Sequence, residues 1–259
     1  MNGLFITGTD TDIGKTVLSA LLLAEIRRRG INAAPMKPVQ TGCLKQDTGH
    51  MDPASSIQCS PSLSVPDLDY SLALASMKVT AEDCTCMSPY RFEPACSPHL
   101  AAELAGEEIE IGQIMIAARA LEARYDLILA EGAGGILVPL NPRETMLDLM
   151  HALKFPVLLA ARPGLGTINH TLLSLRALRS DGLDIAGVVF AAATDTEPGF
   201  IEKDNAAVIE RFGKVPVLGA IPYCRNLAAP SPGFAELPEA VVKAVAEIAD
   251  RLGTCAPIG

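Results

Sequence analysis

The sequence predicts a three-layer α/β fold in which helices flank a mainly parallel central sheet. Apolar strand-like segments alternate with helical segments along the 259 residues, which is the pattern of strand–helix–strand units with right-handed crossovers. Hydrophobic residues make up 49% of the chain and aromatic residues only 4%, so we expect an aliphatic core like that of a sheet buried on both faces. No internal repeat or linker divides the sequence, and we expect residues 1–259 to form a single domain.

The first strand and the first helix enclose the strongest motif. Residues 4–6 are typical of a short buried strand, and a helix is expected over residues 16–29. The loop between them ends in Gly-Lys-Thr at residues 14–16, which is the layout of a phosphate-binding P-loop. Backbone amides at a helix N-terminus attract anions. We therefore expect Lys15 to contact the β- and γ-phosphates of a nucleotide and Thr16 to ligate Mg²⁺.

The glycine spacing of this loop departs from the usual P-loop pattern. In that pattern four residues separate the first glycine from Gly14, which would place a glycine at Thr9. Here Gly8 stands one position earlier. A chance Gly-Lys-Thr is the alternative, and it is disfavoured because strand and helix flank the motif where phosphate binding requires them. The sequence thus predicts a P-loop NTPase-like fold.

The second strand, expected at residues 32–36, ends in Lys37. A lysine at the carboxyl end of a strand beside the P-loop strand faces the ligand crevice of such a sheet. There its charge would stabilise a phosphoryl group during transfer. A strand-end lysine that reaches solvent is an equally weighted alternative, and Thr41 four residues later favours the functional interpretation.

Residues 43–96 form an irregular excursion rich in Ser, Pro, Asp and Cys. We expect one or two short helices in it, one of them near residues 54–58. Long excursions within compact domains are often functional. Asp52 lies in this excursion directly before a proline, and taken alone it reads as a turn residue.

An apolar strand expected at residues 125–130 delivers Glu131 at its carboxyl end. This is the Walker-B arrangement, which places a carboxylate near Mg²⁺. Gly132, Ala133 and Gly134 follow, and glycines there allow the backbone to approach phosphates closely. The alternative is an acidic residue on a glycine-rich turn.

The remaining elements continue the alternation. Residues 166–169 begin a helix after a strand, so their amides are suited to a carboxylate, although spacing alone favours a plain helix start. Strands are expected at 156–161, 185–190 and 215–219, and helices at 97–104, 110–124, 144–153, 166–179, 205–212 and 238–252.

Charge and cysteine content narrow the class of protein. A formal net charge of −9 disfavours nucleic-acid binding through the general surface. The seven cysteines form no CxxC pair, and neither a secretory signal nor an apolar run long enough for a membrane span is evident. We expect a cytoplasmic protein with reduced thiols that binds neither nucleic acid nor a membrane.

Taken together, six sequence blocks resemble the dethiobiotin synthetase family. They occur in that family's order, and the family's P-loop, which reads Gly-Thr-Asp-Thr-acidic-Val-Gly-Lys-Thr, accounts for the unusual glycine spacing. The blocks are GTDTDIGKT at 8–16, KPVQTG at 37–42, SPH at 97–99, EGAGG at 131–135, LGTINH at 165–170 and GAIP at 219–222.

The resemblance implies an ATP-dependent cyclo-ligase of biotin biosynthesis. Such an enzyme carboxylates 7,8-diaminopelargonic acid with CO₂, and the resulting carbamate takes the γ-phosphoryl group of MgATP. The second amine then closes the cyclic urea, giving dethiobiotin, ADP and phosphate. Phosphorylation is needed because a carbamate is a poor electrophile. A homodimer is also implied, with the substrate site near the subunit interface.

The resemblance also assigns residues by position. Lys15 and Lys37 are the catalytic residues, and Thr16, Asp52 and Glu131 hold Mg²⁺. Thr41 contacts the diamine or carbamate, and Gly166, Thr167, Ile168 and Asn169 receive the substrate carboxylate from the neighbouring subunit. Nucleotide binding involves Asp12, Ile13, Gly14, Lys15, Thr16, Val17, Asp52, Glu131, Gly132, Ala133, Gly134, Pro222, Tyr223 and Cys224.

Two departures from the family pattern concern nucleotide choice and length. Ala191-Ala192-Ala193 replaces the usual Asn-Asp, so side-chain recognition of adenine is lost and strict ATP preference is not expected. Residues 60–87 form a longer stretch than usual.

Two other classes of protein remain as alternatives. A partition-type switch ATPase would carry a signature lysine where this chain has Asp10. A cobyrinate-synthetase-like ligase would need room for a glutaminase domain.

Overall fold

The computed structural model describes residues 2–45, 63–192, 194–195, 199–228 and 233–253. Its centre is a six-stranded sheet with the order β10-β9-β8-β1-β7-β2, in which every paired strand is parallel. The three-layer α/β prediction is confirmed. The strands are β1 Gly3–Gly8, β2 Ala33–Met36, β7 Leu127–Glu131, β8 Val157–Ala161, β9 Ile185–Ala191 and β10 Val217–Ile221.

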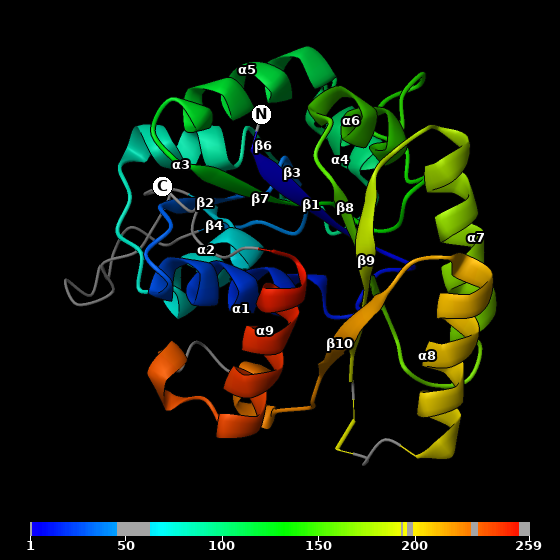
Figure 1. Ribbon diagram of the computed structural model, residues 1–259. Helices are drawn as coiled ribbons and strands as arrows, with labels where there is room; N and C mark the ends of the chain where they lie inside the picture. The colour runs from blue at the N-terminus through cyan, green and yellow to red at the C-terminus, as the bar shows by residue number, and fades with distance from the viewer. Residues whose placement is uncertain (1, 46–62, 193, 196–198, 229–232, 254–259) are drawn as a thin grey trace.

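Helices cover both faces of this sheet (Figure 1). One layer contains α1 and α9, and the other contains α5, α6, α7 and α8, while α4 lies near α6. Because β1 runs between β7 and β8, the loop after β1 opens at the carboxyl edge of the sheet beside both neighbours. The helices are α1 Lys15–Arg28, α4 Pro98–Ala105, α5 Ile111–Glu122, α6 Met146–Leu153, α7 Thr167–Ser180, α8 Phe200–Gly213 and α9 Glu239–Arg251.

The core is aliphatic, as the composition predicts. Four leucines of α1, Leu18, Leu21, Leu22 and Leu23, are completely buried. These leucines are buried because α1 packs against the sheet on one side and against α2 (Pro66–Leu74) and α9 on its others. This packing holds the start of α1 firmly against the end of β1.

The excursion after β2 contains more regular structure than the sequence predicts. Two helices, α2 and α3 (Ala81–Met87), follow one another there, and the helix expected near residues 54–58 lies outside the described residues. Two short strand pairs, β3 with β6 and β4 with β5, accompany them. Their bounds are β3 Val39–Gln40, β4 Leu44–Lys45, β5 Leu63–Ser64 and β6 Tyr90–Arg91.

Helix α8 begins five residues before the position expected from the sequence. The apolar pattern is clear only from Asn205, but Glu202 accepts a hydrogen bond from the Gly199 amide at 2.8 Å and starts the helix at Phe200. Short 3₁₀ turns at Arg225–Ala228 (η1) and Phe234–Glu236 (η2) were not expected.

The structure also tests two expectations from the sequence, that the cysteines are reduced and that no segment spans a membrane. Within the described ranges Cys43, Cys86, Cys96 and Cys224 are free thiols. Cys84 is disulfide-bonded, so the expectation of reduced thiols is wrong for that residue, since spacing does not reveal which thiols meet in the fold. No helix in the described part of the chain is both long and apolar enough to span a bilayer.

A buried ion-pair network joins α1 to α9. Glu25 is completely buried and accepts 2.7 Å bonds from Nε of Arg28 and Nε of Arg29. Arg29 also pairs with Asp250 of α9 at 2.6 Å. Burial alone would raise the pKa of Glu25, but the hydrogen bonds and charges of Arg28 and Arg29 lower it below 4.5.

Glu25→Gln is expected to lower the free energy of unfolding by about 2–4 kcal/mol at neutral pH, because it leaves Arg29, whose side chain is only 17% exposed, without its buried carboxylate partner. A carboxyl group whose pKa is lower in the folded than in the unfolded protein stabilises the fold at pH values above its unfolded pKa. This stabilisation is lost as the pH falls through the pKa of the folded protein. The deficit should therefore shrink on acidification below pH 4.5. Urea denaturation across this range measures it, with exposed Glu247→Gln on α9 as control. An equal loss for both variants would contradict the network's role.

Candidate active site

The loop between β1 and α1 has the backbone of an anion-binding cradle. Asp12 and Gly14 both have positive φ, 54° and 88°, and alternation of this kind turns successive amides toward one concavity. Gly14 is required here, since a Cβ on it would lie 2.7 Å from that of Ala191. The Thr9 amide donates to the carbonyl of Ala160 on β8 at 3.1 Å, which ties the loop to the sheet.

Lys15 folds back across this cradle. Its Nζ donates to the Asp10 carbonyl oxygen at 2.6 Å. Burial, aided by the positive charge of Lys37, lowers the pKa of Lys15 to about 8, although Glu131, Asp67 and Asp10 oppose the shift. A desolvated ammonium beside turned-in amides is a strong attractor for a phosphate group.

Glu131 stands at the end of β7, as the Walker-B pattern predicts. Its Oε1 accepts a hydrogen bond from the Thr16 hydroxyl at 2.8 Å and another from Lys37 Nζ at 2.7 Å. The three residues come from β7, α1 and the end of β2, which are neighbours at the carboxyl edge of the sheet. The sequence-predicted residues Thr16, Lys37 and Glu131 thus converge.

Asp67 completes the cluster, although the sequence motifs do not predict it as a site residue. Its Oδ2 lies 2.7 Å from Lys37 Nζ, and its backbone amide donates to Gln40 Oε1 at 3.3 Å. Pro66 is the first residue of α2 and Asp67 lies in that first turn. A proline followed by acidic residues is a sequence signal for a helix start, so this signal could have predicted that Asp67 lies in the first turn of a helix.

The charges of this cluster depend on one another. Burial favours neutral Lys37, but Glu131 and Asp67 reverse this and raise the pKa of Lys37. Burial would also raise the pKa of Asp67, yet the charge of Lys37 outweighs it and the pKa is lowered. For Glu131 burial prevails over Lys37, and the pKa is raised. The cluster is therefore a pair of largely buried acids whose repulsion one lysine partly offsets.

A cavity of about 490 Å³ brings most of the predicted site residues together. Thr11 and Gln40 join Asp67 as lining residues that were not among the predicted ones. The predicted residues in its wall are Asp12, Gly14, Lys15, Thr16, Val17, Lys37, Thr41, Glu131, Ala133 and Gly134.

The other predicted residues lie outside this wall. Ile13 is buried beside Gly8, where it supports the loop, and the Gly132 carbonyl accepts a 3.3 Å bond from Lys37. Asp52 lies outside the described residues. Pro222, Tyr223 and Cys224 follow β10, and residues 166–169 follow β8.

The oxygen donors fit Mg²⁺, although they are few. Thr16, Asp67 and Glu131 offer one hydroxyl and two carboxylates around the ammonium of Lys37. No group of three or more His, Cys, Asp or Glu suited to a metal occurs among the residues that the structure describes. Mg²⁺ commonly uses one or two carboxylates and completes its shell with water and phosphate oxygens, so this set suffices.

The start of α7 has its own anion-binding geometry. Gly166 has φ of 89° and precedes the helix, while Asn169 and His170 are exposed. Leu165 beside it is 99% exposed. The Thr167 hydroxyl lies 3.3 Å from that of Thr171, so it is used within the helix. The Thr167 amide donates to the Gly164 carbonyl at 3.2 Å, so the other first-turn amides, those of Ile168 and Asn169, are the backbone donors at this helix start.

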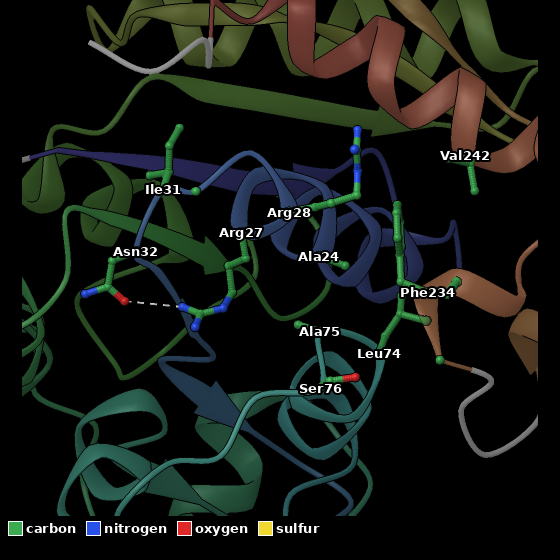
Figure 2. A pocket seen from close by; sticks show the side chains of 13 residues that line it. Ala24, Arg27, Arg28, Ile31, Asn32, Leu74, Ala75, Ser76, Phe234 and Val242 are labelled. Atoms are coloured by element: carbon green, nitrogen blue, oxygen red, sulfur yellow. Dashed lines mark hydrogen bonds between the residues drawn. The ribbon is translucent and has the colours of Figure 1, made fainter. Parts of the chain in front are cut away.

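A larger cavity of about 890 Å³ lies elsewhere, at the opposite end of α1 from the P-loop. Figure 2 shows Arg27 and Asn32 bonded to each other within it. Arg27 also donates to the Ala33 carbonyl, and Arg28 is held by Glu25. No P-loop residue lines this cavity. Its size therefore does not make it the reaction site.

Sequence comparisons agree with the site geometry. Residues 2–231 match a family described as AAA domain. An ATP-dependent dethiobiotin synthetase BioD from Anaeromyxobacter sp. strain Fw109-5 is 37% identical, covering 88% of this chain and 93% of that protein. A protein of the same name from Anoxybacillus flavithermus is 38% identical, covering 88% and 95%.

Structural comparisons show the fold alone. MinD in the MinC:MinD complex of Aquifex aeolicus aligns with a TM-score of 0.60 at 14% identity, covering 98% of this chain and 96% of that one. A ParA family ATPase from Chlorobium tepidum aligns with a TM-score of 0.58 at 13% identity, covering 97% and 98%. Identities this low do not carry function across, whereas the sequence relatives do distinguish between classes of P-loop protein.

Proposed function

The chain belongs to the dethiobiotin synthetase family, and from this membership we infer that it is an ATP-dependent ligase forming dethiobiotin, ADP and phosphate from 7,8-diaminopelargonic acid, CO₂ and ATP. The observation that carries this inference is the convergence of Lys37, Glu131 and Asp67 on the P-loop, with 2.7 Å separations to Nζ of Lys37. Phosphoryl transfer needs positioning and charge stabilisation more than covalent chemistry, and this cluster supplies both. We place the reaction in the cytoplasm.

Each residue has a role that follows from its position. Loop amides and Lys15 bind the nucleotide phosphates, and Lys37 neutralises the carbamate and phosphoryl oxygens as charge moves between them. Thr41 at the cavity wall hydrogen-bonds the diamine or carbamate. Thr16, Glu131 and Asp67 would hold Mg²⁺, and the assignment of Asp52 to the same ion stays a prediction. When bound, that ion supplies charge stabilisation to the phosphate oxygens.

Substrate-dependent phosphate release tests the proposal. The protein is mixed with ATP, bicarbonate and 7,8-diaminopelargonic acid, and each component is omitted in turn. We expect phosphate only when all are present, because the acceptor carbamate forms only from the diamine and CO₂. Phosphate release at the same rate with and without the diamine would instead support a switch-type ATPase.

Nucleotide selectivity is expected to be weak. Ala191 ends β9 and Ala192 follows it, and neither carries a side-chain hydrogen-bonding group, so only backbone groups near Pro222–Cys224 remain to contact the base. CTP and GTP should compete with ATP within about tenfold in affinity, since one hydrogen bond contributes little more than this. Competition binding measures it, and Ala192→Asn should restore a preference for ATP. A hundredfold preference in the unaltered protein would refute the inference.

We further propose a homodimer in which residues 166–169 of one subunit receive the substrate carboxylate bound by the other. The exposure of Gly166 and Asn169 at the start of α7 and the 99% exposure of Leu165 support this arrangement, because a fully exposed leucine beside a helix N-terminus fits a subunit contact. Closed two-fold dimers are the commonest protein assemblies.

Subunit mixing tests this arrangement. Lys37→Ala removes the phosphate side of the site, and Asn169→Asp places a repelling charge at the carboxylate side. If the two sides meet between subunits, equal mixing should restore about one quarter of the activity, since half of the dimers are mixed and each then has one intact site. If both sides belong to one subunit, mixing should restore nothing.

A further inference from the structure

We propose that Lys37 serves as the built-in cation of the Glu131–Asp67 pair, and that Mg²⁺ displaces it from these carboxylates and thereby frees it for the reacting oxygens. This inference rests on the proposed function, because it concerns the same residues. It adds a link between two of the assigned roles: binding of Mg²⁺ by the carboxylates and release of Lys37 for the reacting oxygens would occur together.

The donors of Lys37 are fully used within the protein. A lysine ammonium has three N–H groups and no acceptor. In the structure these reach Glu131 Oε1 at 2.7 Å, Asp67 Oδ2 at 2.7 Å and the Gly132 carbonyl at 3.3 Å. A donor must be released before Lys37 can hydrogen-bond a carbamate or phosphoryl oxygen.

Because the side chains of Lys37 and Glu131 are buried, water cannot easily replace the hydrogen bonds between them. The side chains of Lys37 and Glu131 are 6% and 4% exposed. Asp67 is 28% exposed, and both carboxylates lie 2.7 Å from the same ammonium. In so largely buried a site two carboxylates repel one another unless a cation lies between them. Departure of Lys37 from them therefore costs free energy, and a second positive charge in its position removes most of that cost.

Mg²⁺ is suited to take that position. The oxygens that would ligate it belong to the same carboxylates that hold Lys37, and Thr16 bonds one of them at 2.8 Å. A divalent ion neutralises both carboxylates at once, so the attraction that holds the ammonium falls. Lys15, Lys37 and Thr41 line the same cavity, so a released ammonium would stay within that cavity.

Metal titration of the nucleotide-free protein tests the exchange. Lys37→Met keeps an unbranched side chain but removes the competing charge, so Mg²⁺ should bind about tenfold or more tightly than to the unaltered protein. Lys37→Arg keeps the charge and should not show the gain. Lys45→Met is the matched control, since Lys45 is 75% exposed and pairs with Glu93 at the surface. Isothermal titration calorimetry reads the affinities.

Equal or weaker Mg²⁺ binding by a folded Lys37→Met protein would overturn the proposal. If that variant does not fold, the ammonium ¹H–¹⁵N resonance of Lys37 in the unaltered protein gives a second reading. Saturating Mg²⁺ should shift or broaden that resonance, and a bound metal that leaves it unchanged would also overturn the exchange. Neither result depends on turnover, so failure here is distinct from failure to release phosphate with diaminopelargonate.

Discussion

Lys37→Ala is expected to abolish turnover while leaving the protein folded. The side chain is buried at the junction of β2, β7 and α2, and its ammonium is the cation nearest to Glu131 and Asp67. Loss of a desolvated group that stabilises developing charge typically costs several kcal/mol, which corresponds to a fall in kcat of about a thousandfold. Steady-state phosphate release with saturating diaminopelargonate and ATP measures the fall.

A surface lysine separates this effect from a general loss of charge. Lys203 on α8 is exposed, so Lys203→Ala should keep full turnover. Circular dichroism of both variants checks that the fold survives. Turnover of Lys37→Ala within a few-fold of the unaltered protein would remove Lys37 from the chemistry.

Glu131→Gln is expected to weaken binding of the magnesium–nucleotide complex by about a hundredfold. The amide keeps the shape of the side chain but loses the negative charge that a hard cation requires. It also leaves Lys37 with Asp67 as its remaining carboxylate partner in the cluster. Calorimetric titration with ADP, with and without Mg²⁺, separates the metal contribution from the phosphate contribution.

Metal-free ADP provides the internal control for this variant. The loop amides and Lys15 do not depend on Glu131 for their positions, so ADP without Mg²⁺ should bind the variant no more weakly than the unaltered protein. Glu239→Gln on the exposed start of α9 is the matched substitution and should change neither affinity. The same Mg²⁺ dependence in Glu131→Gln and the unaltered protein would show that Glu131 is not a ligand.

The P-loop half of the site was predictable because its determinants are local. Strand, loop and helix are consecutive, so Lys15 and Thr16 could be placed from residues 4–16 alone. Glu131 was predictable for a similar reason, since an apolar strand ends in it and parallel strands share one edge. The structure brings its carboxylate to 2.8 Å from Thr16 across 115 positions of sequence.

The remaining acidic residue was not predicted because its position depends on tertiary packing. Asp67 begins a helix inside an excursion without clear periodicity, and only the packing of α2 on α1 carries it to Lys37. The family resemblance assigns a metal-binding role to Asp52 instead, which lies outside the described residues and stays a prediction. The start of α8 was also not predicted, because it is marked by one hydrogen bond from the Gly199 amide to the Glu202 carboxylate rather than by the apolar pattern.

The most direct test of the central claim follows the carbon of bicarbonate into product. The unaltered protein is incubated with ¹³C-bicarbonate, Mg²⁺, ATP and 7,8-diaminopelargonic acid, and the products are read by mass spectrometry. Dethiobiotin heavier by one mass unit, formed in step with ADP and absent when ATP is omitted, is the predicted result. ADP without labelled dethiobiotin would contradict the assignment of this chain as a dethiobiotin-forming ligase.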